Sequence, residues 1–545
     1  MAISEILLIV LVAGYFVSAI DDLLVDLVYW VCAPFRRQRV IDQDVLDQLP
    51  QKRVAIITAA WHEADVIDRM VLYNAGTIDY DAYDVFIGTY PNDPATQAKV
   101  DLVCAALPNV FKAVAPHPGP TNKADNLNHV LAEVARHEAR VGHRYDFVVM
   151  HDPEDVHHPL ELKVYNHHFE RPDVQMVQTP IYPLQTPARQ FTAGTYMDEF
   201  AEVHTKDLHV REWIGGFVPS AGVATAIRRD ALDRMAAQPG GRMFSTNSLT
   251  EDYDLGLKLA LNGLKTVFVR QRVRRRVYDT GRPAGTPPRV VVEVVATRGA
   301  FPETFATSVR QRTRWTLGTV FQAWKTWGWV GNARIRWLLF HDRKAPWAFT
   351  VVAAGYLFAA VVIAWELARR NFVTTLPPAL PRNSWITWAF TIGSIFLANR
   401  LLQRAVATTR VYGLAAGLLA IPRAPWANVV GMTAAARAAY QFARARRRRE
   451  TLAWDKTEHT VPMLVATRMR LGELLIQMGA LTEAQLVLAL REQARGGQRV
   501  GEVVIRLGFI TEDELTIALA RQQQQLAQQQ QQSTSTLNAP SDAAA

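Results

Sequence analysis

Two long uncharged stretches in the second half of the chain constrain its fold more than any other feature. Residues 345–365 carry no charged side chain, and residues 383–399 form a second such run. A helix of about 17–25 apolar residues is long enough to cross a bilayer core of about 30 Å. The Pro-rich segment 376–381 between the runs is typical of a turn outside the membrane. The sequence therefore predicts two membrane-spanning helices over 345–402.

A third apolar run lies near the N-terminus, over residues 6–20. No positive region precedes it, so a cleaved signal peptide is a poor interpretation, and Arg36 and Arg37 follow it. We therefore expect a spanning helix within residues 1–34, with its N-terminus outside and the next domain in the cytosol. Asp21 and Asp26 follow the run closely. Such acids face either a protein interior or the membrane interface, and both alternatives remain open here.

Residues 411–422 and 424–436 are apolar but too short to span, and they are interrupted by Pro422 and Pro425. As one spanning helix they would place Arg423 near the bilayer centre, at a cost of about 2.5–3.5 kcal/mol. We expect interfacial amphipathic helices and a basic linker over 411–449, which leaves three spans in total.

The net charge of +9 does not indicate a nucleic-acid partner, because the basic residues cluster beside the apolar segments. The chain has two cysteines, too few for a disulfide framework. The soluble parts are therefore expected in a reducing compartment.

Residues 50–340 form the predicted soluble domain. Short apolar runs at 54–58, 84–88 and 146–150 alternate with helical sequence, which is typical of a parallel, doubly wound α/β sheet. Ligands bind such sheets at the carboxyl ends of the strands. Polar clusters follow each run, at 61–63, 90–93 and 151–155.

The last cluster suggests a metal. Asp152 and Glu154 alternate in an extended turn, and Mg²⁺ or Mn²⁺ takes one or two such carboxylates and completes its shell with phosphate oxygens. The same acids are also typical of a turn that caps the following helix, so this cluster alone does not decide.

Three further segments, 121–128, 250–252 and 311–315, read Thr-Asn-Lys-Ala-Asp-Asn-Leu-Asn, Thr-Glu-Asp and Gln-Arg-Thr-Arg-Trp. With the acidic cluster they resemble, in order, the motifs of processive family-2 glycosyltransferases of the Rossmann-like GT-A fold, the class of cellulose and hyaluronan synthases. Two positions depart from the pattern: His62 precedes Glu63, and Glu154 replaces the second aspartate of the metal motif.

The resemblance implies a role for each motif residue. Glu63, Asp93 and Lys123 would bind the nucleotide-sugar donor, and Asp152 and Glu154 the metal. The Thr-Glu-Asp motif would be catalytic through Glu251 and Asp252, with Asp252 as the general base. Gln311, Arg314 and Trp315 would border the acceptor and the diphosphate. Taken singly, 250–252 is also a plausible helix start and Arg314-Trp315 a plausible membrane anchor.

Residues 470–522 contain an internal repeat with an offset of 29 residues. Each copy begins Arg-x-Gly, continues with an apolar pair, turns at a glycine and enters an amphipathic helix preceded by Thr482 or Thr511. One interpretation is a ligand-free helical hairpin. The repeat also resembles the N-terminal module of MshE-type secretion and pilus ATPases, which binds cyclic di-GMP.

By that resemblance, residues 460–523 form a small, mainly α domain, and residues 524–545 a disordered tail. The cyclic di-GMP residues would be Arg470, Leu471, Gly472, Leu475, Gly479, Leu486, Leu490 and Gln493 in the first copy, and Arg499, Val500, Gly501, Val504, Gly508, Leu515, Leu519 and Gln522 in the second.

A membrane synthase with this module resembles the bacteriophage adsorption protein B group of inner-membrane glycosyltransferases. The resemblance implies an inverting hexosyltransferase in the bacterial inner membrane, with both soluble domains cytosolic. It would move sugar from a UDP-linked donor to a polysaccharide under control of cyclic di-GMP, with membrane lipids and export proteins as partners. The alternatives are single transfer to a polyprenyl phosphate and an inactive scaffold that senses the dinucleotide.

Overall fold

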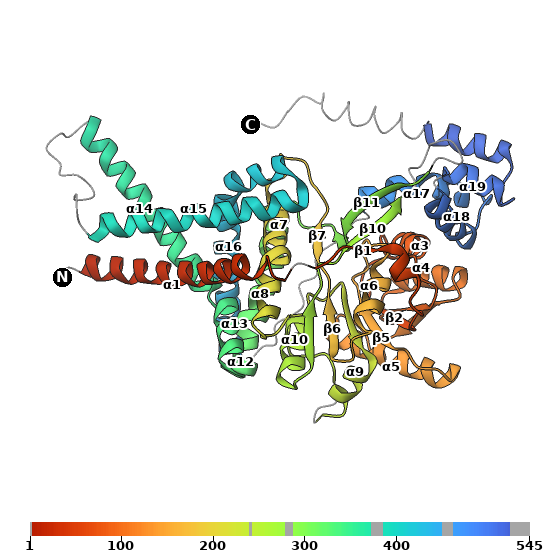
Figure 1. Cartoon of the computed structure of the whole chain (residues 1–545), viewed down its shortest axis with the longest axis horizontal. Coiled ribbons are helices and arrows are strands. Elements are labelled where there is room, and N and C mark those ends of the chain that lie inside the picture. The colour runs from red at the N-terminus through yellow and green to blue at the C-terminus, as the bar shows by residue number, and fades with distance from the viewer. Residues whose placement is uncertain are drawn as a thin grey trace.

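The computed structural model describes residues 3–36, 38–238, 242–277, 287–371, 385–448, 462–496 and 498–523. Figure 1 shows three parts: long helices at one end, an α/β domain in the middle and a small helical module beside that domain. The expected Pro-rich turn at 376–381 and the expected tail at 524–545 lie outside the described residues.

The centre of the α/β domain is a seven-stranded sheet in the order β4-β3-β2-β5-β8-β6-β9, in which β8 alone runs antiparallel to its neighbours. Two smaller sheets join β1 to β10 and β11, and β12 to β7. The strands are β1 (Ile41–Asp42), β2 (Val54–Ala59), β3 (Tyr83–Thr89), β4 (Val110–Val114), β5 (Phe147–Met150), β6 (Val174–Gln178), β7 (Ile181–Pro183), β8 (Thr225–Arg228), β9 (Lys265–Phe268), β10 (Arg272–Val277), β11 (Arg289–Val294) and β12 (Thr297–Gly299).

All six residues of β2 are buried, because helices cover both faces of this central strand. The helices of the domain are α2 (Gln43–Asp47), α3 (Ile67–Thr77), α4 (Pro94–Ala106), α5 (Lys123–Val141), α6 (Glu161–His168), α7 (Phe191–Glu202), α8 (Leu208–Trp213), α9 (Arg229–Ala236), α10 (Glu251–Leu261), α11 (Phe305–Thr316), α12 (Ala323–Trp327) and α13 (Ala333–Arg343), with π-helical turns at Val203–Asp207 and Leu317–Gln322. The three strands predicted at 54–58, 84–88 and 146–150 are β2, β3 and β5, so the predicted GT-A-like α/β fold is confirmed.

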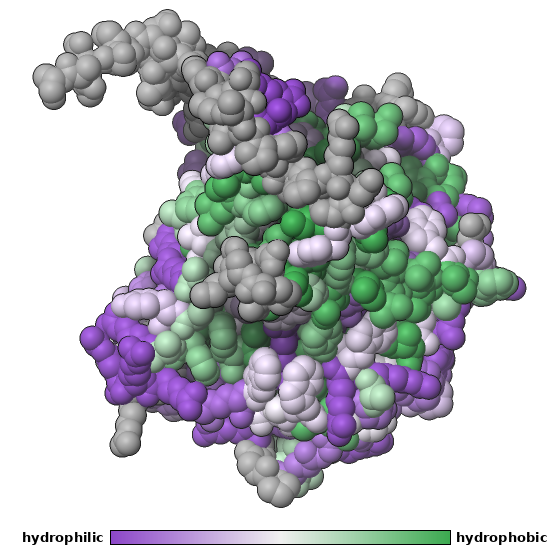
Figure 2. All heavy atoms as spheres, turned by 90° about the vertical axis from the view of Figure 1, so that its left-hand side faces the viewer, coloured by the Kyte–Doolittle hydropathy of each residue, from purple (hydrophilic) through white to green (hydrophobic). Residues whose placement is uncertain are grey.

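Three helices of the described chain are long and apolar enough to cross a membrane, as predicted: α1 over Leu8–Cys32, α14 (Ala345–Asn371) and α15 (Trp385–Tyr412). They project together from one end of the α/β domain, and α1 packs against both of the others. Figure 2 shows that this end of the molecule presents a broad hydrophobic surface with hydrophilic side chains at its margin.

Ion pairs join α1 to the rest of the protein. The carboxylate of Asp21 pairs with Lys344, and that of Asp26 pairs with Lys206 and accepts a hydrogen bond from Asn399 Nδ2 at 2.8 Å. Both acids are only 4% exposed. Of the two alternatives for these acids, the structure therefore favours the one in which they face a protein interior.

The region expected to hold two short helices is instead one continuous helix, α16 (Leu414–Arg448), which includes Pro422 and Pro425. It packs against α7, α11, α14 and α15. Arg423 is buried and donates hydrogen bonds to both carboxylate oxygens of Asp198, at 2.7 and 2.9 Å. The prediction of separate helices was wrong because packing and this ion pair hold the helix through its prolines.

The C-terminal module contains α17 (Met463–Gln477), α18 (Glu483–Gly496), α19 (Val500–Arg506) and a last helix over 512–523. In each copy a glycine with φ of +72° or +71°, Gly479 or Gly508, ends the first helix. The predicted caps are confirmed, because the hydroxyl oxygens of Thr482 and Thr511 accept hydrogen bonds from backbone N–H groups three residues later, at 3.3 Å. The module packs on α3 and α4 of the α/β domain (Figure 1).

Candidate active site

Lys123 lies at the centre of the candidate site. It is the first residue of α5, and the side-chain oxygen of Asn122 caps this helix by accepting a hydrogen bond from the Asp125 N–H at 2.8 Å. The Lys123 ammonium pairs with the carboxylate of Asp152, which follows β5, and donates to the Gly222 carbonyl oxygen at 3.3 Å. The fold thus brings a predicted donor residue into contact with a predicted metal ligand.

The carboxylates of Glu251 and Asp252 also attract the Lys123 ammonium electrostatically. Burial lowers the pKa of Lys123, but its attraction to Asp152, Glu251 and Asp252 outweighs burial and raises that pKa above its ordinary value. Burial and the neighbouring Asp252 raise the pKa of Glu251 to about 7, and burial raises the pKa of Asp252. Burial is the main cause of both raised pKa values, and the attraction of Lys123 offsets it in part.

The acidic side chains near Lys123 outnumber this one cation, and such a set suits a divalent cation. Asp152 pairs with the Lys123 ammonium, Glu251 and Asp252 attract that ammonium, and Glu154, 8% exposed, lies two residues beyond Asp152 in the same loop. Hard oxygen ligands of this kind suit Mg²⁺ or Mn²⁺. Asp152 is the more accessible of the two predicted ligands, with its side chain 32% exposed.

The Thr-Glu-Asp motif lies where α10 begins, and it is next to the loop that contains Gly222. Gly222 has a φ of +77°, and a Cβ atom at this position would lie 2.7 Å from Oδ2 of Asp252. Only glycine therefore allows this close approach of the backbone to the predicted base. The acids do occupy the first turn of a helix, as the structural alternative expected, but the Thr250 side chain makes no capping hydrogen bond.

The Gln-Arg-Thr-Arg-Trp segment lies in α11, beside the Thr-Glu-Asp motif. A Cβ atom at Gly318, just beyond α11, would lie 2.3 Å from Oγ1 of Thr250. Gln322 Oε1 accepts a hydrogen bond from the Leu249 N–H at 2.8 Å. The charge of Arg314 lowers the pKa values of Glu251 and Asp252, partly offsetting the effect of burial. The two motifs therefore form one surface.

Two residues of that segment have protein neighbours of their own. The Trp315 ring lies 6.0 Å from Tyr196 and 6.2 Å from Phe200, measured between ring centroids. Trp315 and Gln311 are both half-buried. The Trp315 indole is therefore held by neighbouring aromatic rings, which fix its orientation.

The predicted donor residues Glu63 and Asp93 meet through Thr96. Asp93 caps α4 by accepting a hydrogen bond from the Thr96 N–H at 3.3 Å, and it accepts a second from the His62 N–H at 2.7 Å. Burial raises the pKa of Asp93, but these hydrogen bonds outweigh it and hold that pKa below its ordinary value. The Glu63 N–H donates to Thr96 Oγ1 at 2.9 Å.

Sequence reasoning assigned no role to a neighbouring set of residues within the clusters 61–63 and 90–93. The Trp61 and Tyr90 rings meet edge to face at 5.0 Å, and Gly119 packs against both. The Asn92 side chain exchanges two hydrogen bonds of 2.7 Å with the Gly119 backbone. Trp61 and Tyr90 follow β2 and β3 directly, so their place at the strand ends was the available signal.

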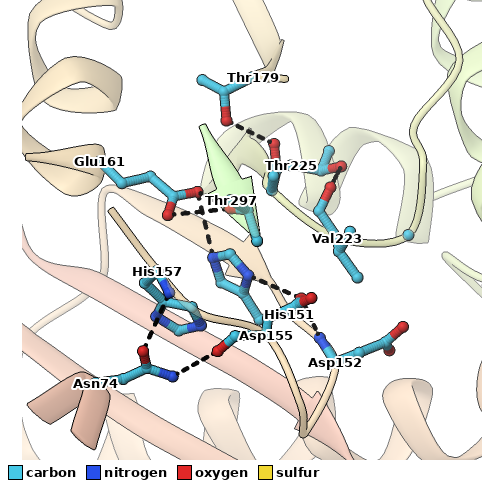
Figure 3. A network of polar contacts seen from close by, with 12 residues as sticks. Asn74, His151, Asp152, Asp155, His157, Glu161, Thr179, Val223, Thr225 and Thr297 are labelled. Atoms are coloured by element: carbon cyan, nitrogen blue, oxygen red, sulfur yellow. Dashed lines mark hydrogen bonds and ion pairs between the residues drawn. The ribbon is translucent and has the colours of Figure 1, made fainter. Parts of the chain in front are cut away.

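A buried network supports the acidic loop from behind (Figure 3). His151 Nδ1 lies 3.2 Å from Asp155 Oδ2, and its Nε2 lies 3.4 Å from Glu161 Oε1. Asp155 Oδ2 also accepts a hydrogen bond from the Asp152 N–H at 2.9 Å. Burial lowers the pKa of His151, but Glu161 and Asp155 outweigh it and raise that pKa to about 9. Burial raises the pKa of Glu161, but His151 outweighs it and lowers that pKa to about 2. The imidazolium thus fixes the loop that contains Asp152.

The repeat residues of the C-terminal module form two equivalent helix pairs. A Cβ atom at Gly472 would lie 2.4 Å from Leu486, and one at Gly501 would lie 2.9 Å from Leu515. Each glycine therefore lets two helices cross closely. Of the two repeat arginines, Arg470 is half-buried and Arg499 is exposed.

The copies also differ in the exposure of Leu490 and its counterpart Leu519. Leu490 is 5% exposed and packs against Gly76 of α3, whereas its counterpart Leu519 is 40% exposed. In this structure Leu490 thus contacts the α/β domain.

Comparisons with known proteins agree with this geometry. The family described as "Glycosyltransferase like family 2" matches residues 50–318. The bacteriophage adsorption protein B of Escherichia coli K12 is 36% identical over 516 residues, covering 90% of this chain and 67% of that protein, and the bacteriophage N4 adsorption protein B of E. coli O157:H7 matches equally.

A mannosyltransferase, PcManGT from Pyrobaculum calidifontis in complex with GDP-Man and Mn²⁺, has a TM-score of 0.45 and 17% identity, covering 79% of this chain and 98% of its own. Glucosyl-3-phosphoglycerate synthase from Mycobacterium tuberculosis, with Mn²⁺ and UDP-glucose, has a TM-score of 0.27 and 16% identity, covering 46% and 78%. The family match over residues 50–318 and the 36% identity to adsorption protein B show that the chain belongs to the glycosyltransferases of family 2, in the bacteriophage adsorption protein B family.

Proposed function

We propose that this glycosyltransferase works at the bacterial inner membrane, with its active site in the cytosol. It transfers a hexose from a UDP-sugar to a growing polysaccharide for export, and cyclic di-GMP regulates it through the C-terminal module. The convergence of Lys123, Asp152, Glu251 and Asp252 at one point of the site carries the proposal for catalysis.

In the proposed reaction Asp252 accepts the proton of the acceptor hydroxyl, whose oxygen forms a bond to the sugar C1. The bond between C1 and the diphosphate breaks in the same displacement, so the configuration at C1 inverts. Asp152 and Glu154 would hold Mg²⁺ or Mn²⁺, which would neutralise the charge of the leaving diphosphate. Lys123 would place a second positive charge beside that diphosphate, and Glu63 and Asp93 would orient the nucleoside.

A radiolabelled UDP-sugar screen with purified membranes tests this function and its alternative. A ladder of polymer lengths that requires Mn²⁺ or Mg²⁺ supports the synthase. A single lipid-soluble product supports transfer to a polyprenyl phosphate. The absence of transfer from every UDP-sugar would refute the proposed donor class.

Regulation is tested on the module residues. An arginine that contacts guanine in a bidentate manner contributes about 1–3 kcal/mol, so Arg470→Ala or Arg499→Ala should weaken cyclic di-GMP binding about 5- to 150-fold. Calorimetry on the full-length protein in detergent measures this directly. Binding of the dinucleotide to a protein that transfers no sugar would favour the alternative of a sensing scaffold.

Three helices long and apolar enough to span a membrane support the proposed orientation. Two crossings, α14 and α15, separate the α/β domain from the C-terminal module, so both lie on the same side. A cysteine at Gly496 should resist a membrane-impermeant thiol reagent applied from the periplasm, whereas one at Leu380 should react. Labelling at Gly496 would contradict the cytosolic placement.

A further inference from the structure

We propose that α3 connects the C-terminal module to the active site. We also propose that Asn74 on α3 is the positioning residue for the metal-motif loop, which is the segment 151–155 that follows β5. The inference deepens the proposed function: the α3 connection stands without the dinucleotide, whereas its use in regulation rests on cyclic di-GMP binding.

The module contacts the C-terminal end of α3 directly. Arg491 of α18 donates from Nε to the Ala75 carbonyl oxygen at 2.9 Å and from its guanidinium to Tyr83 Oη at 3.2 Å. A Cβ atom at Gly76 would lie 2.8 Å from Leu490, so the two helices touch backbone to side chain. The module is therefore held on α3 by hydrogen bonds to specific atoms in addition to apolar packing.

A second contact lies about two turns earlier, where Arg69 of α3 pairs with Glu473 of α17 at 3.2 Å. Ile67 and Met70 of α3 share one buried apolar cluster with residues of the module. The interface is therefore continuous along α3. A movement of α17 and α18 displaces α3 or breaks these contacts.

The other side of α3 holds the metal-motif loop. Asn74 is 7% exposed, and its Nδ2 donates to the Asp155 carbonyl oxygen at 2.8 Å. Its Oδ1 accepts from the His157 N–H at 3.1 Å (Figure 3). The Asp155 carboxylate in turn accepts from the Asp152 N–H at 2.9 Å. One buried amide thus fixes the backbone of the loop that presents the predicted metal ligands.

The two sets of contacts are adjacent in the chain. Asn74 holds the loop, and the next two residues, Ala75 and Gly76, hold the module. A cavity of about 30 Å³, lined by Asn74, Ala75, Asp152 and His157 among others, lies between α3 and the loop. A displacement of the module is therefore transmitted to Asp152 through a single helical turn.

The donor side is connected to the same helix. The N–H groups of Val66 and Ile67 donate to the Glu63 carbonyl oxygen at 3.0 and 2.9 Å. α3 therefore begins at a predicted donor residue and ends beneath the metal-motif loop. Its displacement would change both parts of the nucleotide-sugar site together.

Mn²⁺ binding to the full-length protein in detergent, with UDP present, tests the connection. Loss of the free-ion paramagnetic resonance signal measures this binding without any turnover. Residues that orient metal ligands typically change metal affinity 10- to 100-fold, so Asn74→Ala should weaken Mn²⁺ binding about that much. Asn74→Asp keeps the acceptor for His157 but loses the donor to Asp155, and should fall between Asn74→Ala and the wild type.

Arg491→Ala tests the module side, with Arg495→Ala as the matched control. Arg495 lies on the same helix, and its exposed side chain pairs with Glu492 of the module at 3.5 Å. Arg491→Ala should weaken Mn²⁺ binding about 2- to 30-fold, the usual range for a residue within a coupling network. Arg495→Ala should leave it unchanged. Equal Mn²⁺ affinities in the wild type, Asn74→Ala and Arg491→Ala would overturn the inference.

Measuring Mn²⁺ affinity with and without cyclic di-GMP distinguishes a failure of the α3 connection from a failure of the proposed regulation. In the wild type, saturating cyclic di-GMP should change Mn²⁺ affinity about 5- to 150-fold, and Arg491→Ala should abolish that effect while still binding the dinucleotide. A wild type that binds no cyclic di-GMP refutes the proposed regulation but leaves the variant comparison to decide on α3. A full dinucleotide effect retained in Arg491→Ala refutes α3 as the route.

Discussion

Gly222→Ala should disable catalysis and cause only a modest loss of fold stability. At a φ of +77°, an alanine costs about 1–2 kcal/mol of stability, because its Cβ crowds the following carbonyl oxygen. The new Cβ would also lie 2.7 Å from Asp252 Oδ2, whereas ordinary contacts begin at 3.4 Å. The carboxylate must therefore move by about 0.7 Å, and misplacing a catalytic group by about 1 Å can cost 100-fold in rate. We expect kcat to fall about 30- to 100-fold.

Gly263→Ala is the matched control. Gly263 follows the other end of α10 with a φ of +70°, and a Cβ atom there would meet no atom of the described chain within 4 Å beyond its own sequence neighbours. It should show the same loss of stability in thermal unfolding but normal kcat in the radiolabelled-sugar assay. A kcat for Gly222→Ala within twofold of the wild type, or an equal loss of kcat in both variants, would refute the role assigned to this contact.

Three further outcomes are expected. Asp252→Asn should abolish transfer while leaving UDP-sugar binding by calorimetry nearly intact, because a base acts on the transition state; near-normal turnover would remove Asp252 from that role. Arg423→Met should lower the free energy of unfolding by about 3–5 kcal/mol, since it leaves the Asp198 carboxylate buried and unpaired. The double variant Arg423→Met with Asp198→Leu should recover most of that loss in thermal unfolding. A loss below about 1 kcal/mol in the single variant would contradict the buried pair. Chelation of divalent cations should stop transfer, and Mn²⁺ should restore it; transfer that persists in excess chelator would exclude the predicted metal.

The spans and the main strands were predictable because local pattern decides them. An uncharged run such as 345–365 can be accommodated in few places other than a membrane, and β2 is apolar at nearly every position because both faces are covered. The caps Thr482 and Thr511 were predictable for the same reason, since a capping box joins residues three apart.

The remainder depended on partners far away in the chain. Nothing near Arg423 indicates that Asp198, 225 residues earlier, will neutralise it and keep α16 continuous through two prolines. The contact between Arg491 and Ala75 spans 416 residues. In the site, the strand-end rule placed Asp152 and Asp93 at the correct edge of the sheet, but the pairing of Lys123 with Asp152 follows from how α5 packs.

The ion pairs of α1 have a consequence for how the protein is made. Asp21 enters the membrane region early in synthesis, yet its partner Lys344 follows 323 residues later. At about 5–20 residues per second, translation of that interval takes about 15–65 s. During this time Asp21 lacks the lysine that pairs with it in the finished protein, so the carboxylate of Asp21 is not neutralised by Lys344 until residue 344 has been made. Early termination of the chain before α14 would therefore leave a helix that the bilayer holds weakly.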